Sequence, residues 1–540
     1  MTTTASPSRS PAREPGSVIL RDFRAAMEAR RAGGLSVRLP VVRSFQAAEA
    51  SPFTAGFPGW DASINALLLN ARPVLVTRSR HWARNTGAGR RFHDLVRDNG
   101  AGPVGFTLRM RCGDWRQEKG GRWVFRLDKL ANDAIERAWL AWCARGQCEA
   151  TGRLSFADVC RLQLDTCARD GEYLVRQLRG ADNRFRYGLQ LLQTDRLDHH
   201  HNVTPAYGGD EVRMGVHRNS MGRATAYSIL RGVPNDVGGR RDAETVPAAE
   251  VLHDFVTLDA EQARGVPWSH ATLVGGNMLA RFADYAMYAA QVGASQQGFI
   301  EQTAEAPLPI DADQLGTQVD ANGDRVKELA PGAIDWLPPG AKFSAFNSQY
   351  PHQAFEPFVN SFKHDIAAGL SVAHHNLTGD MTKVNYSSAR IAELAERDHW
   401  RGIGTWFIGS LVMPVFTGWL EMALLSGQVT LANGQALSVT RIDKYLAGAV
   451  FTGRGWDWID PQKEVAAAKE AIAERLTTRS QVVASKGGDY EDNCIELAQE
   501  REIEAANGIA AQTPAPAPAP APKPGKTDDD DEGHDDDDED

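Results

Sequence analysis

The stretch IAAGLSVAHHNLTGDMTKVNYSSAR, residues 366–390, is the part of the sequence that says most about the fold. Helical patterning leads into it over residues 354–370 and resumes over residues 387–400. Between the two helical patterns, residues 378–383 read Thr-Gly-Asp-Met-Thr-Lys, a combination of glycine and short polar residues that breaks a helix. The pattern therefore predicts two helices that flank an exposed polar loop.

Other short pieces accompany this stretch in a characteristic order. They are residues 78–80, 83–85, 95–100, 170–172, 192–198, 246–253, 264–268 and 458–461. As an ordered set spanning roughly residues 60–485, they and residues 366–390 closely resemble the lambda-type portal proteins of tailed bacteriophages. Two features depart from that resemblance: His374 and His375 stand where the family usually has a Pro-Tyr-like pair, and the Ala/Pro-rich and acidic C-terminal tail is not part of the pattern.

The resemblance implies an α+β portal fold with a mixed wing, long stem helices, a small clip and a mostly helical crown. Assigned by order along the chain, the expected regions are an N-terminal arm with a short helix (1–35), wing (36–265), stem helix (266–295), clip (296–350), stem helix (353–375), tunnel loop (376–390), wing (391–455), crown (456–510) and a disordered tail (511–540).

The resemblance also implies a function. Family members form a homo-dodecameric ring at one capsid vertex, and double-stranded DNA passes through the ring during packaging and ejection. The expected partners are the terminase large subunit, the major capsid and scaffold proteins, and the head-completion or tail adaptor proteins. The expected location is the virion, and the host cytoplasm during assembly.

The loop supplies the candidates for contact with DNA in the channel: Lys383, Asn385, Tyr386, Ser387 and Arg390. They combine cations with short hydrogen-bonding groups, which suits weak, sequence-independent contact with phosphates. A second interpretation stays open, because Asn and Ser are also favoured caps of a following helix.

The most basic part of the chain is residues 72–126, with twelve arginines and one lysine against four acidic residues. Its central part, residues 78–98, places Trp82, Phe92, Leu95 and Val96 among the arginines, so an amphipathic helix is expected. The arginines are candidates for a subunit interface or a DNA-facing surface, and a solvated face is the alternative. These candidates are Arg78, Arg80, Arg84, Arg90, Arg91 and Arg97.

The net charge of −10 comes from the end of the chain, because residues 528–540 carry eleven carboxylates and no Lys or Arg. Without them, 59 basic side chains face 58 acidic ones, so the rest of the chain is nearly neutral. Near neutrality suits a channel for moving DNA, since tight phosphate binding would stall the DNA. Residues 513–524 alternate Pro with Ala, which predicts a stiff, extended spacer.

No motif supports catalysis or a cofactor. The six cysteines include no Cys-x-x-Cys pair, and no metalloprotease, hydrolase, phosphate-loop or dinucleotide-binding motif occurs. His199-His200-His201 lack a spaced ligand set, so no metal site is expected. The chain is therefore expected not to be an enzyme. A nucleic-acid-processing enzyme with an unrecognised site is one alternative.

Residues 402–420 are nineteen uncharged residues, long enough to span a bilayer. This makes a membrane-associated protein the other alternative. Four glycines, Pro414 and an adjacent Glu421 favour a buried helix or helix pair instead, and no membrane partner is expected. Elsewhere, helices are expected over residues 156–167, 268–291, 461–485 and 489–507, and strands over 172–179 and 187–193.

Overall fold

The computed structural model describes residues 62–205, 209–234, 236, 242–295, 298–302, 318–319, 325–326, 341–345, 355–382, 384–456, 461–488 and 490–507. The predicted N-terminal arm and C-terminal tail lie outside these residues, as do Lys383 and most of residues 296–350. All helices and strands below belong to the unit that begins at Ile64.

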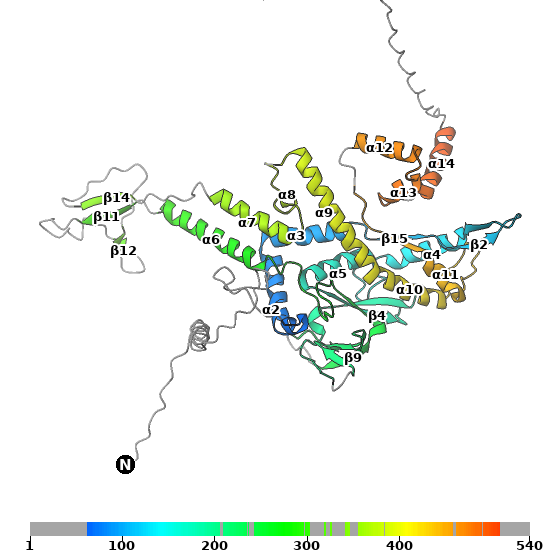
Figure 1. The fold of residues 1–540 in the computed structure, drawn as a ribbon, viewed down its shortest axis with the longest axis horizontal. Helices are drawn as coiled ribbons and strands as arrows, with labels where there is room; N and C mark the ends of the chain where they lie inside the picture. Colours follow the sequence, from blue (N-terminus) through cyan, green and yellow to red (C-terminus); the bar gives the residue numbers. More distant parts are fainter. Residues whose placement is uncertain are drawn as a thin grey trace, which may run out of the picture. The chain divides into compact units, whose positions relative to one another are not determined.

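The fold is α+β, as the sequence predicted (Figure 1). The helices are α2 (Ile64–Asn85), α3 (Gly87–Leu95), α4 (Lys129–Cys143), α5 (Phe156–Asp170), α6 (Leu273–Ser295), α7 (Phe355–Gly369), α8 (His374–Thr378), α9 (Tyr386–Phe407), α10 (Met413–Leu425), α11 (Ile442–Ala447), α12 (Pro461–Ala473), α13 (Arg479–Ala484) and α14 (Tyr490–Ala506). Two π-helical segments, Val96–Ala101 and Ile408–Val412, extend α3 and join α9 to α10.

The strands form small antiparallel sheets. The larger two have the orders β10-β4-β5 and β6-β7-β8-β9. The strands are β1 (Thr107–Met110), β2 (Gly113–Gln117), β3 (Trp123–Leu127), β4 (Tyr173–Arg179), β5 (Tyr187–Leu192), β6 (Glu211–Arg213), β7 (Val216–Arg218), β8 (Ala224–Leu230), β9 (Ala243–Pro247), β10 (Val251–Asp254), β11 (Gly298–Gln302), β12 (Gln318–Val319), β13 (Arg325–Val326), β14 (Ala341–Ala345) and β15 (Ala449–Thr452). The remaining strands pair as β1-β15, β2-β3, β11-β14 and β12-β13.

An aromatic core joins segments that are far apart in the sequence. Trp139 of α4 contacts Phe156 of α5, Trp419 of α10 and Phe451 of β15, with ring centroids 5.0–5.9 Å apart. Strand β1 pairs with β15 over four residues, so the chain before residue 265 and the chain after residue 390 share one core.

The uncharged stretch 402–420 forms part of this core. The helical run from Ser387 to Leu425 is long and apolar enough to cross a membrane, yet half of its most apolar window is buried within the protein. From Phe407 onward, the side chains with 0% exposure include Leu411, Phe416 and Trp419. Pro414 explains the π-helical segment, because a proline lacks an N–H and clashes with the carbonyl four residues earlier in a regular α-helix. The prediction of a buried helix is confirmed.

One predicted helix is wrong in its length. Residues 461–485 form two helices, because α12 ends at Ala473 and α13 begins only at Arg479. Arg475 has a φ of +62°, which no helix interior tolerates, and Thr478 starts a new capping box with Gln481. The β-branched pair Thr477-Thr478 was the local signal for this break.

Candidate functional site

The stretch that the sequence singled out forms the connection between α7 and α9. After α7, the short helix α8 ends at Gly379, whose φ of +72° is the left-handed conformation that glycine adopts readily. The chain then crosses residues 380–385 and enters α9. The predicted arrangement of two helices around a polar loop is confirmed, with α8 as an addition.

The two ends of the loop are held by different contacts. On the α9 side, Asn385 caps the helix, because its side-chain oxygen accepts a hydrogen bond from the Ser388 N–H at 2.8 Å. On the other side, the Asp380 carboxylate accepts from the N–H and hydroxyl of Thr382. The Thr382 hydroxyl, helped by its N–H, lowers the pKa of Asp380, so this carboxyl is charged at neutral pH. The capping interpretation of Asn385 is thus confirmed.

Replacing Asn385 by Ala should lower the free energy of unfolding by about 1 kcal/mol, the usual loss when a capping side chain is removed. Urea unfolding followed by circular dichroism measures this change. Asn385→Ser keeps a capping oxygen and should lose much less. Ser387→Ala changes an exposed position in the first turn of α9 and serves as the control. Equal losses in Asn385→Ala and Ser387→Ala would contradict the capping role.

Glu396 was missed by the sequence analysis and holds α8 against α9. Its carboxylate is 5% exposed and accepts from the Ala373 N–H, the Asn376 amide and the Trp400 indole N–H, at 2.8, 2.8 and 3.0 Å. The Arg91 guanidinium on α3 donates to the Asn376 carbonyl. The sequence feature that could have indicated this contact is a glutamate four residues before a tryptophan, a spacing that places both side chains on one face of a helix.

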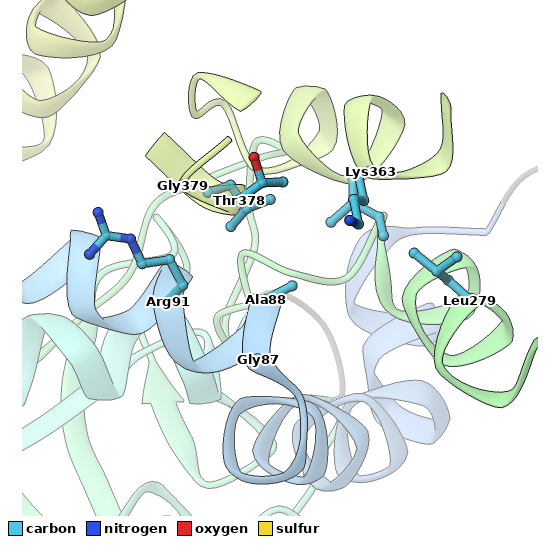
Figure 2. Close-up of a pocket in the computed structure, with 9 residues that line it drawn as sticks. Gly87, Ala88, Arg91, Leu279, Lys363, Thr378 and Gly379 are labelled. Carbon is cyan, nitrogen blue, oxygen red and sulfur yellow. The ribbon is translucent and has the colours of Figure 1, made fainter. Parts of the chain in front are cut away.

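Beside the loop lies a cleft of about 490 Å³ (Figure 2). Its walls come from α3, α6, α7 and α8, and Figure 2 shows Arg91 and Lys363 on opposite sides of it. Leu279, Ile366 and Leu377 supply apolar surface. Arg91, which lines this cleft, also donates to the Asn376 carbonyl and so links α3 to α8.

Two histidines stack at the base of the loop. His364 of α7 and His374 of α8 have ring centroids 3.7 Å apart. Burial lowers the pKa of His374, and the neighbouring His364 imidazole lowers it further. The folded protein therefore favours the neutral form of His374.

This arrangement predicts a pH dependence of stability. Because the pKa of His374 is lower in the folded than in the unfolded state, where it is about 6.5, the unfolded chain binds more protons below that pH. Stability is thus retained at higher pH and lost as the pH falls through this range. His374→Gln should make the free energy of unfolding depend less on pH between about pH 7 and 5. His81→Gln, at an exposed position, is the control, and a slope unchanged from wild type in His374→Gln would contradict the prediction.

The remaining loop candidates lie at the start of α9. Tyr386 is its first residue, Ser387 is exposed, and Arg390 lies 3.8 Å from Glu464 of α12. Lys383 lies outside the described residues. Their contact with DNA stays a prediction.

The arginine candidates fall into three groups. The predicted amphipathic segment is helical with a break at Thr86, and its four apolar residues are buried. Arg80 contacts Asp170 and Asp195, and Arg97 contacts Asp94 and Asp165, so these two arginines are used within the chain. Arg91 is exposed and contacts the Asn376 carbonyl. The other three are exposed and form no ion pair with any described residue: Arg78, Arg84 and Arg90.

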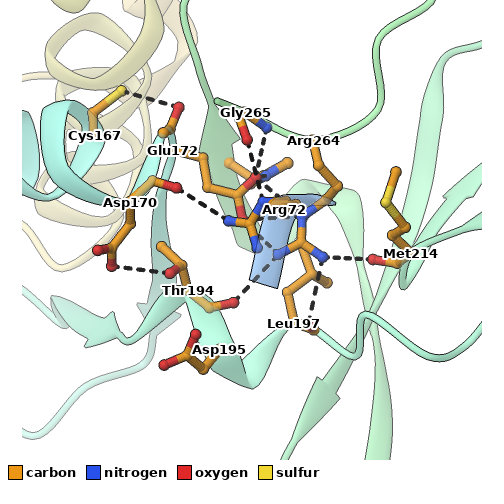
Figure 3. Close-up of polar contacts among 12 residues, drawn as sticks. Arg72, Cys167, Asp170, Glu172, Thr194, Asp195, Leu197, Met214, Arg264 and Gly265 are labelled. Atoms are coloured by element: carbon orange, nitrogen blue, oxygen red, sulfur yellow. Dashed lines mark hydrogen bonds and ion pairs between the residues drawn. The ribbon is translucent and has the colours of Figure 1, made fainter. Parts of the chain in front are cut away.

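A buried ion network fastens α2 to the β4 sheet (Figure 3). Glu172 is fully buried, with the Arg264 guanidinium at 2.6 Å and that of Arg72 at 2.8 Å. Burial alone would raise the pKa of the Glu172 carboxyl, but Arg264 and Arg72 outweigh it and hold the pKa well below the usual value. Burial and the nearby Arg264 charge lower the pKa of Arg72 to about 10, so it stays charged at neutral pH.

Two of the sequence pieces meet in this network. Gly171, in the piece 170–172, has a φ of +91° and packs directly on Gly265, in the piece 264–268. A methyl group on Gly171 would lie within 2.6 Å of the Gly265 and Val266 backbone. The glycines are therefore required by close backbone approach.

Within the described residues, no group of three or more His, Cys, Asp or Glu side chains is arranged to hold a metal ion. The cysteines Cys143, Cys160 and Cys167 have pKa values raised well above the ordinary value by burial, so their thiols are not activated nucleophiles.

Comparison with known proteins finds relatives of this chain. The family model for the lambda family of phage portal proteins matches residues 51–403. The chain is 32% identical over 437 residues to the probable portal protein of Halomonas phage phiHAP-1, covering 79% of this chain and 80% of that protein. It is 22% identical over 500 residues to portal protein B of Escherichia phage lambda, covering 84% and 91%. Among solved structures, a chain from the neck of a native gene transfer agent particle, computed with C12 symmetry, is 14% identical with a TM-score of 0.41, covering 80% of this chain and 96% of that chain.

Proposed function

The chain belongs to the lambda family of phage portal proteins, and from this premise we propose that it forms a dodecameric ring at one capsid vertex, through which double-stranded DNA enters and leaves. The observation that carries the proposal is the family match across residues 51–403, which contains the loop between α8 and α9. In such a ring, each subunit contacts its two neighbours through two different surfaces. Repeating this heterologous contact around the axis closes the ring.

The proposed regions follow the order of the elements. Residues 36–265 and 391–455 form the wing, an assignment supported by the β1-β15 pair and the core they share. Helices α6 and α7 lie side by side and form the stem, with Phe282 stacked on Phe355, and the strands β11 to β14 between them belong to the clip. Helices α12 to α14 form the crown.

Exposed apolar side chains on α6 support its burial in the assembled ring. Five large side chains of this helix are 62–72% exposed in the single chain: Val274, Met278, Tyr285, Met287 and Tyr288. Val274, Met278, Tyr285 and Tyr288 share one face of the helix by their spacing, whereas Met287 lies on the other side. An exposed apolar face of this kind is costly in water and typical of an interface. Neighbouring stem helices would cover it. The free arginines Arg78, Arg84 and Arg90 are proposed to face a neighbouring subunit or DNA.

The segment over residues 376–390, which contains the end of α8, the loop and the start of α9, is proposed to line the channel. Both of its ends are held, by Glu396 at Asn376 and by the Asn385 cap. Every subunit of the ring would therefore present the polar groups of this segment at the same position along the channel. Lys383 and Arg390 would touch phosphates weakly and without sequence preference. The near-neutral charge of residues 1–527 supports a channel that does not grip DNA.

The remaining proposals concern partners and activity. The clip would dock the terminase large subunit during packaging and the head-completion proteins afterwards, and the wing would contact the capsid and scaffold proteins. The protein would be assembled in the host cytoplasm and remain in the virion. It would have no enzymatic activity of its own, because ATP hydrolysis would belong to the terminase.

Electron microscopy of the purified full-length protein, with native mass spectrometry in parallel, tests the proposal. We expect rings of twelve subunits with a channel of at least about 24 Å, twice the width of a major groove. If the protein is monomeric, the same measurement is made with capsid and scaffold proteins present. A small oligomer without a channel in both experiments would overturn the proposal.

A further inference from the structure

A second cleft, of about 860 Å³, opens beside strand β5. Its walls are formed by α2, α5, β5 and the loop over residues 149–154. This cleft is separate from the loop between α8 and α9. One of the residues that line it, Arg84, is also a candidate for the subunit interface or DNA-facing surface of the proposed function. Three independent features of its walls bear on the kind of ligand that the cleft would bind.

The first feature is an unpaired strand edge. β5 is the edge strand of the sheet β10-β4-β5. On its outer side, the Leu189 N–H donates to the Cys148 carbonyl at 2.9 Å, and the Leu189 carbonyl accepts from the Ala150 N–H at 2.8 Å. Because peptide groups alternate along a strand, the N–H and C=O of Leu191 point the same way as those of Leu189. They face the cleft without a main-chain partner among the described residues.

The second feature is a buried acceptor without a donor. Gln163 of α5 lines the cleft and is only 3% exposed. Its side-chain carbonyl oxygen accepts no hydrogen bond from any described residue. A buried polar atom left unpaired costs about 1–3 kcal/mol, so a bound group that donates an N–H here would recover that energy.

The third feature is charge. Arg84 and Arg153 line the cleft, and neither forms an ion pair with a described residue. Most of the carboxylates of the cleft are already satisfied within the chain. Glu149 accepts from the N–H groups of Thr151, Arg153 and Leu154, and Asp170 and Asp195 accept from Arg80. Asp236 also lines the cleft. The two free guanidiniums therefore favour a ligand with carboxylates.

We propose that this cleft binds the acidic C-terminal segment of the chain, residues 526–540, as an added strand on the edge of β5. Strand addition supplies main-chain donors and acceptors for Leu191 and an N–H for Gln163, while side-chain carboxylates reach Arg84 and Arg153. The charge match is specific to this segment, because residues 528–540 hold eleven carboxylates and no Lys or Arg. The chain continues for 33 residues after Asn507, a maximum reach of about 110 Å.

Zero-length cross-linking in the full-length protein identifies the occupant. Arg153→Lys keeps the positive charge and introduces an amine that a carbodiimide can join to a carboxylate in contact with it. We expect mass spectrometry to find this amine joined to residues 528–540. Arg78→Lys is the control. It places an amine on α2, the helix that also carries Arg84, but outside the cleft, and it should give at most a tenth of the cross-linking yield of Arg153→Lys. Equal yields at the two positions, or cross-links to another segment only, would overturn the proposal.

Hydrogen exchange separates strand addition from loose attraction of charges. In a chain that ends at residue 510, the Leu191 amide should exchange on the order of tenfold faster than in the full-length protein, as expected for one lost hydrogen bond. The Gln190 amide, which faces β4, is the internal control and should not change. Unchanged exchange at Leu191 would overturn the proposal. Neither measurement requires a ring, so the result is independent of the proposed function.

Discussion

Replacing Glu172 by glutamine should lower the free energy of unfolding by about 3–5 kcal/mol, the loss measured when one partner of a buried ion pair is removed. The variant leaves the guanidiniums of Arg72 and Arg264 buried without their carboxylate, with side chains 4% and 0% exposed. Glutamine has nearly the same shape, so the loss reflects charge rather than packing. Urea unfolding at neutral pH measures the difference.

The matched control for this variant is Glu118→Gln. Glu118 pairs with Arg126 at 2.7 Å, similar to the distances at Glu172, but its side chain is 45% exposed. An exposed pair contributes only about 0–1 kcal/mol, because water solvates both charges after the pair is broken. If the two variants lose similar stability, then burial is not the cause and the role assigned to the network is wrong.

The same network shows where local sequence patterns stop being informative. The sequence predicted a helix over residues 156–167 and strands over residues 172–179 and 187–193, because these patterns follow from short-range periodicity. It did not predict that residues 264–265 would return to residues 170–172, some 92 residues later. Such a contact depends on tertiary packing, which periodicity does not encode.

The candidate residues show the same division. The amphipathic character of residues 78–98 was predicted correctly, because buried aromatic residues recur on one helical face. Which arginines stay free was not predictable, since Arg80 is neutralised by Asp170 and Asp195 from distant segments. At the loop, the Asn385 cap is a local feature and was among the stated interpretations, whereas Glu396 became visible only once α8 was seen to fold against α9.

Replacing Trp139 by alanine should lower the free energy of unfolding by about 3–5 kcal/mol, the range for deleting a large aromatic side chain from a core. Trp139 is 2% exposed and contacts aromatic rings from α4, α5, α10 and β15. The variant therefore weakens the contact between the chain before residue 265 and the chain after residue 390. If these two parts form one wing, they should still unfold in a single transition at a lower denaturant concentration.

The control for packing is Trp115→Ala. Trp115 lies in the β2-β3 hairpin, stacks edge-on against Phe125 and is 64% exposed, so its removal creates no buried cavity. Its loss should be well below that of Trp139→Ala, because most of its surface is already in water. Tryptophan fluorescence and circular dichroism should follow the same transition in both variants. If they separated in Trp139→Ala, the segments around β1 and β15 would be independent units, and the assignment of both to one wing would fail.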